Sequence, residues 1–208
     1  HGTSRGLGDV YKRQEIIASF PRGELRDYLE LISKSEVKIA VKPQYVDKLP
    51  KLWDGEVRGL LQKVDDRGRL EEFAEITSIE HILERKLSGL SGGELQRVAI
   101  CATILKEADV YFFDEPSSYL DIHERMRVVS IIQSLVEDGK RIIVIEHDLA
   151  ILDVLCDLVH IVYGQRAAYG IFTPPRTTRT AINAYLDGYL NEENVRCLLY
   201  TSDAADDL

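Results

Sequence analysis

One stretch of the sequence combines a helix-capping pattern with two adjacent glycines, Leu90–Gln96. Ser91 and Glu94 have the S-x-x-E spacing of a capping box, which predicts that a helix begins here. Gly92 and Gly93 carry no side chain, so another backbone or a phosphate can approach closely. The free N–H groups and the positive dipole end of a helix N-terminus favour an anion. The stretch is therefore a candidate phosphate-binding site.

Two carboxylates form a second chemical group, directly after the apolar run Val110–Phe113. This run is short and does not alternate, which is typical of a parallel strand buried between helices. Asp114 and Glu115 at its end therefore lie where open α/β sheets bind their ligands. A second apolar run, 141–146, is predicted to be another buried strand, and it ends at His147.

In this order, LSGGELQ followed by FFDEP resembles the signature motif and the Walker B motif of ATP-binding-cassette (ABC) ATPases. The resemblance implies an α/β fold, with a partial P-loop NTPase core of mostly parallel sheet and a helical subdomain. It also implies that ATP and Mg²⁺ are the cofactors.

The resemblance assigns roles to four residues around one nucleotide. Asp114 would hold Mg²⁺, which prefers hard oxygen ligands, and Glu115 would polarise the attacking water as general base. His147 matches the switch histidine that contacts the γ-phosphate. Gln44 lies just beyond a predicted strand and matches the Q-loop, whose amide can coordinate Mg²⁺ and sense the γ-phosphate.

Further roles implied by the resemblance involve a second cassette. Ser91, Gly92 and Gly93 would contact the γ-phosphate of ATP held by the opposite cassette, and Gln96 of the same motif is counted with the nucleotide-binding residues. Asp121 matches the D-loop aspartate, which communicates across the interface between two cassettes.

The phosphate cradle of these ATPases, G-x-x-x-x-G-K-[ST], does not occur in this sequence. Its only Gly-Lys pair, Gly139-Lys140, is followed by Arg141. We expect the motif upstream of Gln44, and we expect the chain by itself to hydrolyse ATP negligibly, so its status as an enzyme stays open. Because the strand that precedes this motif is also missing from the sequence, we expect the core to be incomplete and to expose apolar sheet surface.

The elements that position these residues follow from hydrophobic spacing and capping signals. In chain order, they are a helix at 23–32, a strand at 37–41, helices within 51–84 interrupted at 66–68, a helix from 91 to 105, strands at 110–113 and 141–146 with a helix at 122–136 between them, a helix at 148–156, strands at 158–163 and 167–172 joined by a turn at Gly164-Gln165, and a helix at 178–190.

The domain organisation is read from composition and from the resemblance. Residues 1–14 and 197–208 resemble translated adapter sequence and are interpreted as foreign, disordered ends. Residues 15–172 are predicted to form an ABC nucleotide-binding domain without Walker A, with its helical subdomain at about 48–106. Residues 173–196 resemble a hinge segment.

Charge and cysteine content exclude several classes. The net charge of −9 argues against a surface that binds nucleic acid throughout. Cys101, Cys156 and Cys197 form no C-x-x-C pair, so neither a disulfide framework nor a zinc site is indicated. No apolar run reaches the length of a membrane helix and no signal peptide is visible. We therefore expect a cytoplasmic protein without a membrane partner.

Three segments, 42–47, 114–121 and 169–174, resemble the first nucleotide-binding domain of the ribosome-recycling ABC ATPases, the RNase L inhibitor family. The resemblance implies an intact protein with two iron–sulfur clusters in an N-terminal domain outside this chain, and a second ABC cassette in the same full-length chain. It further implies ribosomal subunits and release factors as partners, and ATP binding and hydrolysis coupled to ribosome splitting.

Two other functions remain open from the sequence. The chain could be the ATP-binding subunit of an ABC transporter, which predicts membrane subunits contacting the helical insert near Tyr45. It could also be a degenerate, non-catalytic cassette that only binds a partner. The retention of both Glu115 and His147 argues against the second of these, because a decayed site has no need of either.

Overall fold

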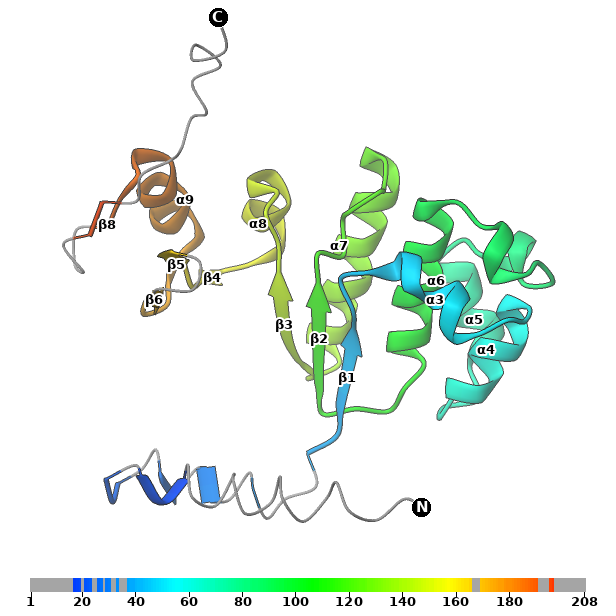
Figure 1. The fold of residues 1–208 in the computed structure, drawn as a ribbon, viewed down its shortest axis with the longest axis horizontal. Coiled ribbons are helices and arrows are strands. Elements are labelled where there is room, and N and C mark those ends of the chain that lie inside the picture. The colour runs from blue at the N-terminus through cyan, green and yellow to red at the C-terminus, as the bar shows by residue number, and fades with distance from the viewer. Residues whose placement is uncertain are drawn as a thin grey trace, which may run out of the picture.

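The centre of the protein is a three-stranded parallel sheet in the order β1-β2-β3 (Figure 1). The computed structural model describes residues 17–19, 21–23, 26–27, 29–30, 33, 37–165, 169–190 and 195–196. Its sheet consists of β1 (Ile39–Lys42), β2 (Val110–Asp114) and β3 (Arg141–Ile145), with Val41 beside Phe112 and Phe112 beside Ile143. Because the strands are parallel, the segments that follow them all emerge at one edge. This confirms the α/β class.

One face of the sheet packs against two long helices, α6 (Gly92–Ile104) and α7 (Ile122–Glu137). On this face Ala40, Tyr111 and Phe113 are fully buried, and Ile142 and Val144 of β3 are partly buried. They join one continuous hydrophobic cluster with the inner residues of both helices. The main core of the described residues therefore lies on this side, and it holds the carboxyl ends of β1 and β2 in place.

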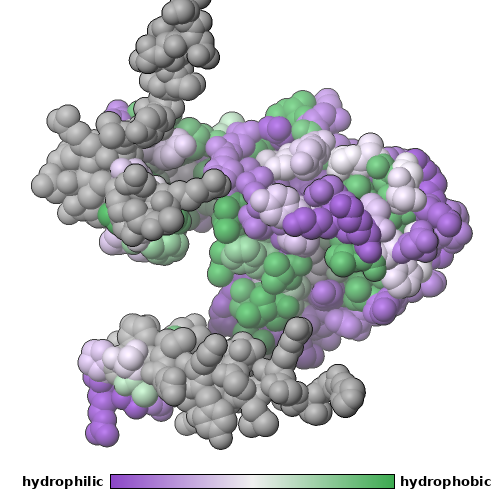
Figure 2. Space-filling model, in the orientation of Figure 1, coloured by the Kyte–Doolittle hydropathy of each residue, from purple (hydrophilic) through white to green (hydrophobic). Residues whose placement is uncertain are grey.

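The opposite face of the sheet is apolar and exposed, and Figure 2 shows a hydrophobic patch in this region. Ile39 and Val41 of β1 are 61% and 50% exposed, and Ile143 and Ile145 of β3 are 52% and 43% exposed. The expectation of exposed apolar sheet surface is confirmed. The strand predicted at 141–146 is confirmed as β3, but its predicted burial is wrong, because one of its faces is open. The run at 110–113 is likewise fully buried on one face only.

The segment between β1 and α6 is helical, as predicted. Its elements are η1 (Val46–Lys48), α3 (Leu49–Leu52), α4 (Val57–Val64), α5 (Leu70–Ile76), η2 (Glu80–Ile82) and η3 (Leu87–Gly89). The break between α4 and α5 is stabilised by Asp65, whose carboxylate accepts hydrogen bonds from the backbone N–H groups of Arg67, Arg69 and Leu70. Leu61, Phe73 and Ile82 join the core from this side.

The remaining elements follow β3. They are α8 (Leu149–Leu155), β4 (Leu158–Val159), β5 (Val162–Gln165), β6 (Tyr169–Phe172), β7 (Arg176–Thr177), α9 (Thr178–Asp187), β8 (Tyr189–Leu190) and β9 (Val195–Arg196). β5 and β6 form an antiparallel pair. Gly164 and Gln165 lie inside β5 and pair with β6, so the predicted turn at these two residues is wrong. A small second cluster is centred on Ile161 and Ala181.

Several predictions lie outside the described residues. These are the foreign ends at 1–14 and 197–208, much of the helix at 23–32, and part of the segment predicted as a hinge. Among the described residues, no helix is both long enough and apolar enough to cross a membrane.

Candidate functional site

The carboxylate of Glu115 is the meeting point of three chain segments at the carboxyl edge of the sheet. Gln44, beyond β1, donates its amide N–H to Glu115 Oε1 at 2.7 Å. His147, beyond β3, places Nε2 3.2 Å from the same oxygen. Ser118 donates its hydroxyl to Glu115 Oε2 at 3.1 Å. Of the residues expected at one site, Gln44 and His147 therefore both contact the same carboxylate, that of Glu115.

The exposure of these side chains differs in a way that suits catalysis. The Glu115 side chain is 21% exposed, whereas that of His147 is 78% exposed. The carboxylate is thus sheltered and oriented, while the imidazole is free to meet an incoming ligand. Glu115 also has a positive φ of 47°, which is uncommon for a residue with a side chain. Such backbone conformations persist where the surrounding contacts enforce them.

The backbone at Glu115 is held by the side chain of Lys42, the last residue of β1. Lys42 is fully buried, and its ammonium donates to the carbonyl oxygens of Asp114 at 2.7 Å and Glu115 at 3.1 Å. Burial lowers the pKa of Lys42 to about 8, although the nearby carboxylates of Asp114, Glu115 and Glu146 oppose this effect. Sequence reasoning gave Lys42 no role, because a lysine at a strand end resembles an ordinary surface residue.

Gln96 of the signature segment makes the second contact with this backbone. Its side chain is fully buried, and its amide nitrogen donates to the Glu115 carbonyl at 2.7 Å. In this structure the Gln96 amide therefore binds the chain itself, one turn into α6. The side chain connects the signature helix to the residue that follows β2.

Glu146 is a further residue that the sequence did not single out. Its carboxylate accepts backbone N–H groups from Ser117 at 3.3 Å, His147 at 3.0 Å and Asp148 at 3.4 Å. It therefore ties the turn after β2 to the segment that carries His147. The signal available in the sequence was its place between a strand and a capping Asp148, where a carboxylate can accept unpaired backbone N–H groups.

The signature segment forms the capped helix start that its spacing predicts. Ser91 Oγ accepts the Glu94 N–H at 3.3 Å, and the Glu94 carboxylate accepts the Ser91 N–H at 2.7 Å. The bond from the Ser91 backbone lowers the pKa of Glu94 below its ordinary value. Ser91 and Gly92 are exposed. They are available to a ligand on the outside of the molecule.

The two signature glycines lie against the loop that follows Glu115. A Cβ added at Gly93 would come within 3.0 Å of the Tyr119 carbonyl oxygen, and one at Gly92 within 3.3 Å of the Tyr119 ring. Tyr119 itself has a φ of 64° and a side chain that is 70% exposed. Close approach of these two loops is therefore a second reason for glycine at these positions.

Asp121 caps α7, as its position predicts. Its carboxylate accepts the Glu124 N–H at 3.0 Å, and this bond lowers the pKa of Asp121. One turn later, Arg125 donates to the Leu120 carbonyl at 2.9 Å and to Asp148 Oδ2 at 2.5 Å. Arg125 thus links the Asp121 loop to the cap of α8, next to His147.

The donors present fit the cofactors that the motifs imply. Because the Gln44 nitrogen is engaged with Glu115, the amide oxygen is the atom left for a cation, and Asp114 supplies a carboxylate at the adjacent strand end. Within the described residues, no three His, Cys, Asp or Glu side chains cluster as a metal cage. Mg²⁺ is usually bound through one or two carboxylates and completes its shell with phosphate and water oxygens.

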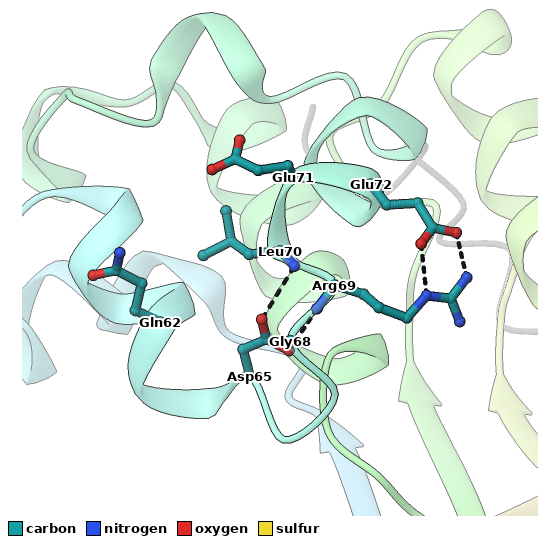
Figure 3. Close-up of a pocket in the computed structure, with 7 residues that line it drawn as sticks. All are labelled: Gln62, Asp65, Gly68, Arg69, Leu70, Glu71 and Glu72. Atoms are coloured by element: carbon teal, nitrogen blue, oxygen red, sulfur yellow. Dashed lines mark hydrogen bonds and ion pairs between the residues drawn. The ribbon is translucent and has the colours of Figure 1, made fainter.

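A surface hollow among the described residues lies elsewhere. It measures about 490 Å³ and lies where α4 gives way to α5, lined by residues such as Gln62, Asp65 and Glu72 (Figure 3). The Asp65 carboxylate is already occupied by backbone N–H groups, and Glu72 pairs with Arg69. These groups satisfy one another, so the hollow adds nothing to the site around Glu115.

The chain is similar to known ABC proteins in sequence and in structure. The family model described as ABC transporter matches residues 13–118. An uncharacterised ABC transporter ATP-binding protein of Methanocaldococcus jannaschii is 48% identical over 182 residues, which cover 88% of this chain and 30% of the relative. The residues that the family model matches make up about half of the chain.

Solved structures agree in sequence and in fold. An archaeal ribosome recycling factor, solved in complex with a ribosomal stalk protein, has a TM-score of 0.83 at 49% identity over 90% of this chain and 36% of its own. A structure named RNase-L inhibitor also has a TM-score of 0.83, at 50% identity over the same shares. The chain spans about a third of the length of the proteins it matches. It belongs to the ABC ATPases, and within them to the RNase L inhibitor family.

Proposed function

We propose that this chain supplies half of each composite ATP site in a two-cassette ATPase that splits ribosomes into subunits. The observation that carries the ATPase part is the Glu115 carboxylate, held between the Gln44 amide and the His147 imidazole at the carboxyl edge of a parallel sheet. The ribosomal part is supported by the similarity to an archaeal ribosome recycling factor.

In this mechanism Glu115 orients the attacking water and accepts its proton. The amide of Gln44 and the hydroxyl of Ser118 fix both carboxylate oxygens, which limits the carboxylate to one orientation. His147 is exposed beside it and reaches the γ-phosphate when nucleotide is bound. A positioned general base of this kind contributes about 10²–10⁴-fold to a rate. Asp114 and the Gln44 oxygen would hold Mg²⁺, which would supply positive charge to the phosphates.

The signature segment serves the other nucleotide. Ser91, Gly92 and the start of α6 lie on the exposed side of the molecule, where the N–H groups of a helix N-terminus attract phosphate. A second cassette would bring its own nucleotide to this surface. Asp121 would lie at the interface between the two cassettes and couple one ATP site to the other. Residues 15–172 would then be cassette and 173–196 hinge, in a cytoplasmic protein that works with ribosomal subunits and release factors.

The test is a chimera in which residues 37–172 replace the matching stretch of the archaeal recycling factor. The chimera should hydrolyse ATP and dissociate ribosomes into subunits, measured by phosphate release and by sucrose-gradient sedimentation. The parent protein is the positive control. ATP hydrolysis without subunit dissociation would reject the ribosomal part of the proposal, and ATP binding without hydrolysis would indicate a degenerate cassette.

A further inference from the structure

Lys42 is an unusual residue because its charge lies beneath the candidate active site with no exposed surface. A buried ammonium is costly unless it is paired or fully hydrogen-bonded. Two of its donors are used by the carbonyl oxygens of Asp114 and Glu115, at 2.7 and 3.1 Å. The lysine therefore binds the backbone carbonyls of the two catalytic-motif residues and not their carboxylates.

The Glu115 carbonyl is bound twice. Gln96 donates to it from α6 at 2.7 Å, so that β1 and the signature helix approach the same oxygen. The two donors hold the peptide group of a residue whose φ of 47° lies in the left-handed region. A residue with a side chain stays in that region only where surrounding contacts over-determine it.

The same strand end also contacts the side chain of Glu115. Gln44 follows Lys42 by two residues and donates to Glu115 Oε1. The end of β1 thus holds Glu115 at its carbonyl through Lys42 and at its carboxylate through Gln44. A shift of β1 would move both contacts together.

We propose that Lys42 is a positioning residue for the general base: by binding the Asp114 and Glu115 carbonyls, it holds Glu115 in the left-handed backbone conformation that presents its carboxylate to the attacking water. The inference rests on the proposed ATPase function. Lys42 does not touch nucleotide in this mechanism, so it acts through Glu115 alone.

The experiment uses Lys42→Met, which keeps the length of the side chain and removes its donors, in a two-cassette chimera whose other ATP site has been inactivated at its own general base. Because a displacement of about 1 Å in a catalytic group can lower a rate about 10²-fold, kcat for ATP should fall by about that factor while KM changes less than about threefold. In the Glu115→Gln background, Lys42→Met should cause no further loss, because the group it positions is already disabled.

Tyr111→Phe is the matched control. Tyr111 is fully buried on the same face of the sheet, and its hydroxyl donates to the Lys106 carbonyl at 2.7 Å, away from Glu115. The variant loses a buried hydrogen bond of similar depth and should keep its kcat. An equal fall of kcat in both variants, or a Lys42→Met loss that adds fully to that of Glu115→Gln, would overturn the proposal.

Two further measurements keep the proposal testable if Lys42→Met folds poorly or the chimera is inactive. Gln96→Met removes the other donor to the Glu115 carbonyl and should also lower kcat with little change in KM. Crystal structures of the variants should show the φ of Glu115 leaving the left-handed region. If Glu115 keeps that φ in the Lys42→Met variant, the inference is contradicted. If the chimera without any substitution is inactive, only the proposed function is contradicted.

Discussion

Glu115 is restrained through its backbone and its side chain at once. Lys42 and Gln96 bind its carbonyl, while Gln44 and Ser118 bind its two carboxylate oxygens. A carboxylate with this many contacts loses little conformational entropy when substrate binds. Positioning a catalytic group before the reaction in this way lowers the activation barrier. The residue is therefore the place where a single atom change should have the largest effect on hydrolysis.

In the chimera whose other ATP site has been inactivated, Glu115→Gln should lower ATP turnover by about 10²–10⁴-fold, because an amide cannot accept the proton of the attacking water. ATP binding should remain, since the amide has nearly the same shape. Steady-state phosphate release and equilibrium binding of a fluorescent ATP analogue measure the two effects. The control is Glu137→Gln at the exposed end of α7, which should turn over normally. Turnover of Glu115→Gln within threefold of the parent would show that another group is the base.

The Cys101 thiol should be protected from chemical labelling in the folded chain. The thiol is fully buried in α6, and burial raises its pKa to about 12. At pH 7.5 the thiolate is therefore nearly absent, and a disulfide reagent should label Cys101 only when the chain unfolds. Peptide mapping after labelling, with half-buried Cys156 as the internal comparison, measures this. Labelling of Cys101 in the native chain at the rate of Cys156 would show that α6 opens locally.

At the scale of elements, α6 begins at its capping box and carries the signature residues on its first turn. Glu94 contributes more than a cap, since its carboxylate also pairs with Arg85 at 2.8 Å. Both contacts favour the ionised form. The orientation of the exposed Ser91 and Gly92 therefore depends on the charge of one side chain.

The folded chain holds the pKa of Glu94 below its unfolded value. Its contribution to stability is thus fully present above about pH 4.5 and is lost as the pH falls through the lower, folded pKa. Urea unfolding of the wild type and of Glu94→Gln should show a difference in free energy of roughly 1 kcal/mol at pH 7, which shrinks toward pH 3.

The control for this series is Glu137→Gln, which lies outside any cap. Its difference from the wild type should stay constant over the same pH range. A Glu94→Gln difference that also stays constant would mean that the neutral side chain caps α6 as well as the carboxylate does.

At the scale of the whole molecule, the uncovered face of the sheet decides how the chain behaves in solution. Ile39, Val41, Ile143 and Ile145 lie together on β1 and β3, each at least 43% exposed. Contiguous apolar patches of this kind bind hydrophobic dyes and cause association. The other face, packed on α6 and α7, should be unaffected by changes here.

Replacing this patch should therefore change association and leave the fold intact. The double variant Val41→Lys, Ile143→Lys should bind less anilinonaphthalene sulfonate and sediment as a smaller species than the wild type. Ile122→Lys, an equally polar change at a site on α7 that is 62% exposed, is the control and should behave as the wild type. If the double variant binds as much dye as the wild type, the dye-binding apolar surface lies elsewhere on the molecule. Fluorescence titration and analytical ultracentrifugation measure the two properties.

Much of the local structure was determined by the sequence itself. The capping residues Ser91, Asp121 and Asp148 begin helices as predicted, and Gly139 ends α7 with a φ of 76°. These features depend on interactions within one turn, so nearby residues are enough to specify them. The segments after the strands meet at one edge because parallel strands all end on the same side.

Only the tertiary structure decided which side of each strand is buried and what lies beneath Glu115. Apolar side chains alternate with others along β1, yet Ala40 and Lys42 are buried and the more apolar Ile39 and Val41 are exposed. A strand offers two faces, and the helices that pack on the sheet choose between them. The Lys42 contacts join residues more than 70 positions apart, and no local pattern in the chain encodes such a pairing.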